Sequence, residues 1–196
     1  MITLASQDVL WLVFGYLAGS ISSAIIVCRM AGLPDPRTQG SGNPGATNVL
    51  RVGNKKHAAI TLAGDFLKGL IPVLLAKMAG ADLNLQITIG LACFLGHLYP
   101  VFFNFRGGKG VATAIGAILA SSWPVGLCII ATWLFVAKVM RISSLSALIT
   151  FFLTPIYAWR LEPEQPYFLT LVIAISVLLF WRHRSNIRKL IEGTED

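Results

Sequence analysis

The chain alternates long apolar runs with short polar segments, and the length of the runs sets the first expectation. A helix needs about twenty apolar residues to cross the hydrocarbon core of a bilayer. The pattern predicts an all-α membrane helix bundle of about seven transmembrane helices, formed by residues 1–196 as a single domain. The expected spans are residues 9–30, 57–78, 85–99, from the glycine turn at 107–110 to about 122, 124–138, 141–159, and from the turn at 160–166 to 181.

Two of these runs carry residues that stand out from their apolar surroundings. Gly15, Gly19 and Ser23 recur at every fourth position of the first run, which predicts a small helix face packed closely against a neighbour. Asp65 and Lys68 lie three residues apart in the second run and therefore share a helix face. Charges inside a span are costly and usually face the bundle interior. This pair is either a mutually neutralising structural pair or a support for a functional site.

Composition and charge agree with a membrane protein. Of the 196 residues, 55% are hydrophobic and only 13% are charged, and the mean hydropathy is +0.70. The net charge of +7 does not form a basic face, because the basic residues gather between the apolar runs. A nucleic-acid partner is therefore not expected.

The distribution of basic residues predicts the orientation of the chain. All of them except Lys68, Lys77 and Arg160 fall on one side of the expected bundle. Because lysine and arginine are retained on the cytoplasmic side, this side is expected to face the cytoplasm, with the N-terminus outside and the C-terminus cytoplasmic.

A glycine-rich polar segment at residues 40–51 interrupts the apolar pattern. Three glycines and a proline within six residues exclude a helix interior, and such backbone can present successive N–H groups to an anion. It contains G-x-G-x-x-G, but an apolar helix precedes it instead of a strand, so it is not a dinucleotide fingerprint. The segment is either a phosphate-binding loop or an ordinary connection. Its candidate residues are Gly40, Ser41, Gly42, Asn43, Gly45, Thr47, Asn48 and Arg51.

A second polar segment, at residues 96–113, leads into the fourth run. A glycine turn before a helix N-terminus favours an anion, because unpaired N–H groups and the helix dipole point at it. It is not a P-loop, since a glycine instead of a hydroxyl residue follows the lysine. A histidine here is either a proton acceptor or a structural residue at a helix end. The candidates are His97, Gly107, Gly108, Lys109 and Gly110.

These polar residues all fall at one membrane boundary, which favours an enzyme that joins a lipid-soluble substrate to a water-soluble one. A membrane carrier for phosphorylated metabolites, the alternative, would place its site near the midplane. A purely structural subunit would not need two glycine turns with cations. The His-x4-Asp acyltransferase pattern is absent, because the fifth residues after the three histidines are Leu62, Phe102 and Arg188.

Residues 40–51, 96–113 and 183–195 resemble the three signature motifs of the bacterial acyl-phosphate:glycerol-3-phosphate acyltransferases. The resemblance implies transfer of a fatty acyl group from acyl phosphate to the 1-hydroxyl of glycerol 3-phosphate. The products are lysophosphatidic acid and phosphate, in the first step of phospholipid synthesis at the bacterial cytoplasmic (inner) membrane. It implies no acyl-CoA, acyl carrier protein, metal or other cofactor; the partners are the two substrates and membrane lipids.

The same resemblance assigns roles to individual residues. Ser41 and Arg51 would be the essential pair of the first motif, and the glycines of the second would shape the glycerol 3-phosphate pocket. The base is either His97 or a phosphate oxygen of the substrate. The catalytic set is Ser41, Arg51, His97 and Lys109, with active site facing the cytoplasm.

The remaining expectations concern the tail and the lipid substrate. His183 and Asn186 would contact the substrate, and Glu195 would hold the tail, which forms a short helix along the headgroups. Small residues of the first and fourth spans would line a lateral route for the acyl tail.

Overall fold

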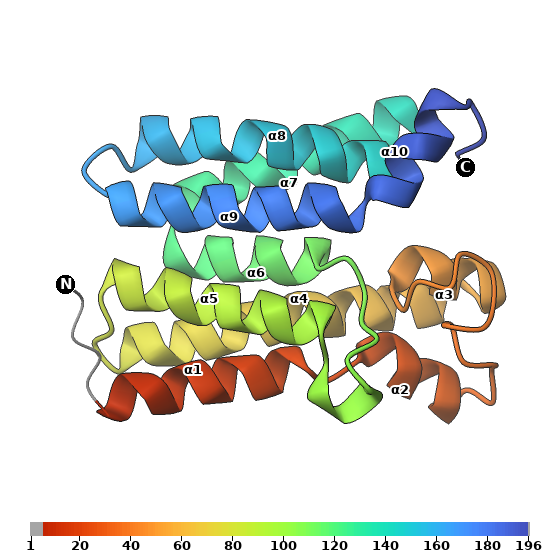
Figure 1. The fold of residues 1–196 in the computed structure, drawn as a ribbon, viewed down its shortest axis with the longest axis horizontal. Helices are drawn as coiled ribbons and strands as arrows, with labels where there is room; N and C mark the ends of the chain where they lie inside the picture. The colour runs from red at the N-terminus through yellow and green to blue at the C-terminus, as the bar shows by residue number, and fades with distance from the viewer. Residues whose placement is uncertain (1–5, 196) are drawn as a thin grey trace. The chain divides into compact units, whose positions relative to one another are not determined.

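The computed structural model describes residues 6–195, and every regular element within that range is a helix (Figure 1). The chain divides into two compact units that meet in sequence at Ser121 and Ser122. Within residues 6–195, four helices are long and apolar enough to cross a membrane, or up to six if each of two bent pairs is one span. The all-α prediction is confirmed, while the count of seven spans and the single domain stay predictions.

The first unit holds both glycine-rich segments. Its helices are α1 (Ser6–Gly19), α2 (Ser23–Met30), α3 (Ala46–Val52), α4 (Lys55–Met78), α5 (Leu83–Leu98), the 3-10 helix η1 (Val101–Phe103) and α6 (Val111–Ser121). The expected fourth span is α6, which has only 11 residues. Both polar segments lie at the same end of this unit, where α4 begins and α5 ends (Figure 1).

The expected first span corresponds to two helices, α1 and α2, with a bend of 40° between them. The Ser20 hydroxyl donates to the Tyr16 carbonyl oxygen over 2.8 Å, and the Ile21 N–H donates to Ala18 in a tighter, three-residue turn. A serine hydroxyl that bonds back to the preceding turn competes with the helix ladder. The break therefore leaves the Ile21 carbonyl outside any helix ladder, and the Lys68 ammonium donates to it over 2.7 Å.

Glycines set the spacing between the helices of the first unit. A Cβ added to Gly19 would lie 2.1 Å from the Cys93 carbonyl oxygen, and one added to Gly96 would lie 2.2 Å from the Tyr16 carbonyl oxygen. The crossing of α4 and α6 is equally close at Gly69 and Gly116. The predicted packing face of the first span is therefore confirmed, with α5 as its main neighbour.

The proposed lateral route for the acyl tail is not supported by this packing. Gly15 and Gly19 contact α5, and Gly116 contacts α4. Close backbone contact leaves these three glycines no room to line a groove, and a route lined by other small residues of the two spans stays a prediction.

The helices of the second unit are α7 (Trp123–Met140), α8 (Ser143–Leu161), α9 (Pro166–Arg182) and the shorter α10 (Arg184–Ile191) (Figure 1). The predicted tail helix is confirmed as α10, which bends away from α9 by 59°. Arginine–tryptophan contacts mark the two ends of this unit. Arg160 lies over Trp159 at one end, and Arg184 lies over Trp181 at the other, 4.7 Å from the ring centre. Such pairs are typical of membrane boundaries.

Replacing Gly19 by alanine is expected to destabilise the first unit, because the new methyl group overlaps the backbone of α5. Overpacking of this kind costs about 1–3 kcal/mol or more. Gly80→Ala is the matched control: its added Cβ meets nothing within 4 Å, and only the strain of a φ of +89° remains, about 1–2 kcal/mol. Thermal unfolding in detergent measures both. An equal loss in the two variants would contradict the close crossing of α1 and α5.

Candidate active site

The first glycine-rich segment is a loop organised around one buried amide. Asn48 is 1% exposed, its Oδ1 accepts from the Ser41 N–H over 3.0 Å, and its Nδ2 donates to the carbonyls of Pro36 and Gln39. Gly40 has a φ of +56°, and an added Cβ there would lie 2.3 Å from the Asn48 oxygen. Asn48 therefore shapes the loop, and glycine is required at position 40 for both its conformation and its contact.

The other residues of this segment lie closer to solvent. Ser41, Gly42 and Thr47 are exposed, Asn43 is half-buried, and Gly45 precedes α3 as its N-cap. Arg51 lies in the last turn of α3 and is exposed. The structure thus keeps the Ser41 and Thr47 hydroxyls and the Arg51 guanidinium at the surface of the unit.

The second segment folds back under the end of α5. The Gly108 N–H donates to the His97 carbonyl oxygen over 3.2 Å. An added Cβ would lie 2.0 Å from the His97 oxygen at Gly107, and 2.3 Å from His97 Nε2 at Gly108. Gly110 has a φ of +83° and faces the Phe94 ring. The turn therefore needs glycine at three positions in order to pass this close to α5.

Lys109 stands in the middle of this turn and is half-buried, and α6 begins two residues later at Val111. The positive end of a helix dipole and a lysine at the same turn favour an anion there. The anion-binding turn predicted for the second glycine-rich segment is consistent with this geometry. The binding roles of its individual residues stay predictions.

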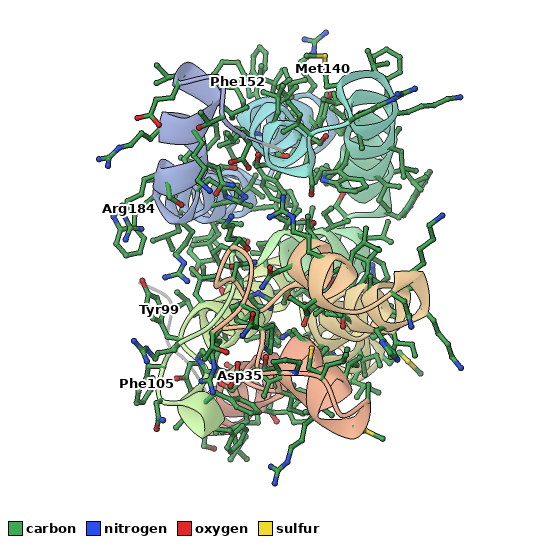
Figure 2. All side chains as sticks on the ribbon, turned by 90° about the vertical axis from the view of Figure 1, so that its right-hand side faces the viewer. Asp35, Tyr99, Phe105, Met140, Phe152 and Arg184 are labelled. Atoms are coloured by element: carbon green, nitrogen blue, oxygen red, sulfur yellow. The ribbon has the colours of Figure 1, made fainter. Side chains whose placement is uncertain are left out.

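The two segments meet in the first unit. An added Cβ at Gly108 would lie 3.0 Å from the Pro44 carbonyl oxygen, so the two loops touch at that point. Arg37, just before the first motif, donates from Nη1 to the Phe103 carbonyl oxygen over 3.2 Å. Figure 2 looks onto this end of the unit, with Asp35, Tyr99 and Phe105 labelled.

A charged pair braces this contact. Arg37 donates to both carboxylate oxygens of Asp35, at 2.7 Å for the closest atoms. These side-chain hydrogen bonds hold the pKa of Asp35 below its usual value, and the same bonds raise the pKa of Arg37. Both groups are therefore ionised at neutral pH, and Arg37 is held in place to reach the Phe103 carbonyl.

Buried charges lie directly behind the second segment. Lys68 Nζ is 2.9 Å from Asp65 Oδ1, and His97 Nδ1 is 3.7 Å from the same oxygen. The Thr113 hydroxyl donates to the Asp65 carbonyl oxygen over 2.8 Å and forms a second hydrogen bond with His97 Nδ1 over 3.2 Å. The sequence left the Asp65–Lys68 pair open between two roles, and the structure places it in contact with a candidate site residue.

The third predicted motif lies in the second unit. Glu195 accepts hydrogen bonds from Ser144, over 2.6 Å, and from Asn186, so the expectation that Glu195 holds the tail in place is confirmed. His183 is 2% exposed, and its Nδ1 bonds the Leu179 carbonyl oxygen over 2.8 Å. Substrate contact by His183 and Asn186 stays a prediction.

Sequence reasoning missed Thr113 and the Asp35–Arg37 brace. Thr113 is sixteen residues from His97, and no local pattern links the two, because a turn and a change of helix separate them. The two charges in Pro34-Asp35-Pro36-Arg37 were the available signal for the brace, since prolines stiffen a loop that holds an ion pair.

The structure defines a helical protein with helices long and apolar enough to cross a membrane, and two glycine-rich segments that touch at one end of its first unit. The glycerol-3-phosphate acyltransferase family model matches residues 9–193. The chain therefore belongs to the glycerol-3-phosphate acyltransferase family, and it is an acyltransferase.

Individual relatives cover nearly the whole chain. The glycerol-3-phosphate acyltransferase of Hydrogenovibrio crunogenus is 54% identical over 196 residues, covering 100% of this chain and 94% of the relative. That of Thioalkalivibrio sulfidiphilus is 57% identical over 180 residues, covering 92% and 88%.

Two solved structures share the fold. They are crystal structures of PlsY, an integral membrane glycerol 3-phosphate acyltransferase, in its glycerol 3-phosphate form and its lysophosphatidic acid form. The TM-scores are 0.91 and 0.88 at 39% and 38% identity, and each match covers 97% of this chain and 95% of the other. The protein is therefore an integral membrane protein.

Breaking the brace is expected to loosen both loops. In Asp35→Asn the carboxylate that holds Arg37 is lost, so amide hydrogen exchange at residues 37–42 and 100–106 should rise, and activity should fall a few-fold. In the unchanged protein the stabilisation is complete at neutral pH and is lost as the pH falls below the ordinary value of the carboxyl and through its lowered folded-state pKa. Arg29→Gln, a change at an exposed arginine of the same unit, is the control. Unchanged exchange in Asp35→Asn would show that the pair does not hold the loops.

Proposed function

We propose that the protein transfers a fatty acyl group from acyl phosphate to the 1-hydroxyl of glycerol 3-phosphate, releasing lysophosphatidic acid and inorganic phosphate. The observation that carries this proposal is the meeting of the two glycine-rich segments at Pro44 and Gly108. Both substrates carry a phosphate, and this end of the unit offers two loops, each with its own cation. The glycerol 3-phosphate and lysophosphatidic acid forms of the related PlsY structures support the acceptor and the product.

The two loops divide the recognition. The turn at residues 107–110, with Lys109 and the N-terminus of α6, binds the phosphate of glycerol 3-phosphate. The loop at residues 40–45, with Ser41 and Arg51, binds the phosphate of the acyl donor. Gly40, Gly42, Asn43, Gly45, Thr47 and Asn48 shape or line this loop, and His183 and Asn186 keep their predicted role as substrate contacts.

The chemistry needs orientation more than a covalent intermediate. Acyl phosphate is an activated mixed anhydride, so holding the acceptor hydroxyl against its carbonyl carbon supplies much of the acceleration. The hydroxyl oxygen forms the ester bond, the carbonyl–phosphate oxygen bond breaks, and phosphate leaves with the electron pair. The proton of the hydroxyl ends on the released phosphate, carried there directly or through His97. Ser41 orients the donor and is not acylated.

The carrier alternative loses its main support in the structure. Charged residues deep in the spans would mark a transport path, and the candidates are Asp65 and Lys68. Lys68 instead bonds the Ile21 carbonyl and Asp65, and both side chains are buried within one unit. The membrane charges are therefore accounted for within the packing of the helices.

The test is product analysis with purified protein, acyl phosphate and glycerol 3-phosphate, with acyl-CoA as the comparison donor. Lysophosphatidic acid should form from acyl phosphate only. Intact mass of the enzyme incubated with acyl phosphate alone should show no adduct, and an acyl group on Ser41 formed and consumed at the rate of turnover would overturn direct transfer. Product from acyl-CoA alone would overturn the donor.

Removing either cation is expected to abolish turnover nearly completely while the protein still inserts and purifies. Arg51→Ala and Lys109→Ala each leave a bound phosphate poorly paired, which costs about 2–5 kcal/mol, or roughly 30-fold to several thousand-fold in kcat/KM. Arg51→Lys should recover only part of the activity, because lysine keeps the positive charge but lacks the bidentate geometry of the guanidinium. Steady-state kinetics at low substrate measure this, and near-normal activity in either alanine variant removes that cation from the site.

We further propose seven spans with the N-terminus outside and the site on the cytoplasmic face of the inner membrane, since lysine and arginine gather at the loop end of the first unit. Single-cysteine labelling in intact cells is the measurement. Cysteines at Ser41, Asn104 and Ser185 should resist a membrane-impermeant reagent, and one at Asp82 should react. Protection at Asp82 together with labelling at Asn104 would invert the orientation.

A further inference from the structure

The buried charges of the first unit converge on one histidine. Asp65 and Lys68 come from α4 and His97 from the last turn of α5. None of the three side chains is more than 7% exposed, and Asp65 Oδ1 lies within 4 Å of both nitrogen groups. The Asp65 carboxylate thus stands between the Lys68 ammonium and the His97 imidazole.

The hydrogen bonds around Thr113 determine where His97 carries its proton. A carbonyl oxygen only accepts, so the single hydroxyl hydrogen of Thr113 goes to the Asp65 carbonyl oxygen, 2.8 Å away. Towards His97 Nδ1, at 3.2 Å, the hydroxyl can then only accept. The hydrogen of the neutral imidazole therefore lies on Nδ1, and Nε2 is the acceptor.

The acceptor nitrogen is aimed at the second glycine-rich segment. His97 Nε2 would lie 2.3 Å from a Cβ at Gly108, which means that the ring edge rests against the backbone of the 107–110 turn. The absence of a side chain at this glycine allows the approach. An acceptor so placed can bond an N–H of the turn or a hydroxyl of a molecule bound in it.

We propose that Asp65 and Thr113 are positioning residues for acyl transfer that act through His97. They hold the imidazole as the Nδ1–H tautomer and present Nε2 to the 107–110 turn, which under the proposed function binds glycerol 3-phosphate. Lys68 pairs with the Asp65 carboxylate and also donates to the Ile21 carbonyl oxygen. The pair in the second span is therefore both structural and functional, because the same carboxylate serves the lysine and the histidine.

The kinetic test uses variants that change one atom group at a time. Thr113→Val removes the hydroxyl and keeps the shape, and kcat/KM for glycerol 3-phosphate should fall about tenfold, as expected for a lost buried hydrogen bond. Thr113→Ser keeps the hydroxyl and should restore activity. Thr61→Val is the matched control, because Thr61 is fully buried in α4 and its hydroxyl has no hydrogen-bond partner within the described residues. Equal losses in Thr61→Val and Thr113→Val would overturn the proposal.

A double-mutant cycle shows whether the effect passes through His97. Asp65→Asn and Thr113→Val should each lower activity in the unchanged protein and cost little more in His97→Gln, because the residue they position is already gone. Fully additive losses would overturn the proposal. The same assays separate this proposal from the proposed function. If the unchanged protein makes no lysophosphatidic acid from acyl phosphate, the proposed function is refuted; if it does, the additivity of the losses tests the positioning role alone.

Nitrogen-15 spectra of ring-labelled histidine give a readout that needs no turnover. The His97 signals, identified by their loss in His97→Gln, should show Nδ1–H in the unchanged protein and in Thr61→Val, and a change of tautomer in Thr113→Val. An Nε2–H ring in the unchanged protein would overturn the proposal, and this spectrum stays informative if the Thr113 variants fail to fold.

Discussion

The structure depends on one constraint: in the hydrocarbon core no water is present, so every backbone polar group must find its partner within the protein. Within the described part of the first unit, lysine side chains supply such a partner at two helix ends. At the bend between α1 and α2, the Lys68 ammonium donates to the Ile21 carbonyl oxygen. At the end of α6, the Lys77 ammonium donates to the Ala120 carbonyl oxygen over 3.2 Å. The buried Lys68 requires its own counter-charge, which Asp65 supplies. Because Asp65 also stands beside His97, the repair of a helix break fixes the charges behind the proposed site.

Glycine has two physical roles here, and they lead to the same place. At the helix crossings, Gly19 and Gly116 let backbones approach within contact distance. At the turn before α6, Gly108 lets the backbone pass against the imidazole of His97. The first role sets where α5 and α6 stand, and the second allows the chain between them to fold back under α5. A larger residue at Gly108 would overlap His97 and crowd the Pro44 carbonyl, where the turn touches the first loop.

The helices, the two loops and the packing face of the first span could be predicted from the sequence, because each depends on a local pattern of residues. Apolar runs gave the helices, glycine and proline clusters gave the loops, and the four-residue spacing of Gly15 and Gly19 gave a packing face. The break in the first span escaped prediction, since no proline marks it and the signal is a serine hydroxyl that bonds backwards. The contact of Asp65 with His97 also escaped, because it joins two helices thirty-two residues apart along the chain. The acyl-tail route stays a prediction: small residues can serve packing or a groove, and at Gly15, Gly19 and Gly116 the contact with a partner helix shows packing.

The hydrogen bonds that Glu195 accepts from Ser144 and Asn186 have a practical consequence for handling the protein. One carboxylate holds Ser144 at the start of α8 and Asn186 in α10, and it lies only a few residues beyond the last turn of α10. An affinity tag fused directly after this residue, or a protease that trims the chain back to Gly193, would disturb a contact inside the second unit rather than a loose end. A purification tag is therefore better placed behind a flexible spacer, and a trimmed preparation should not be taken as equivalent to the full chain.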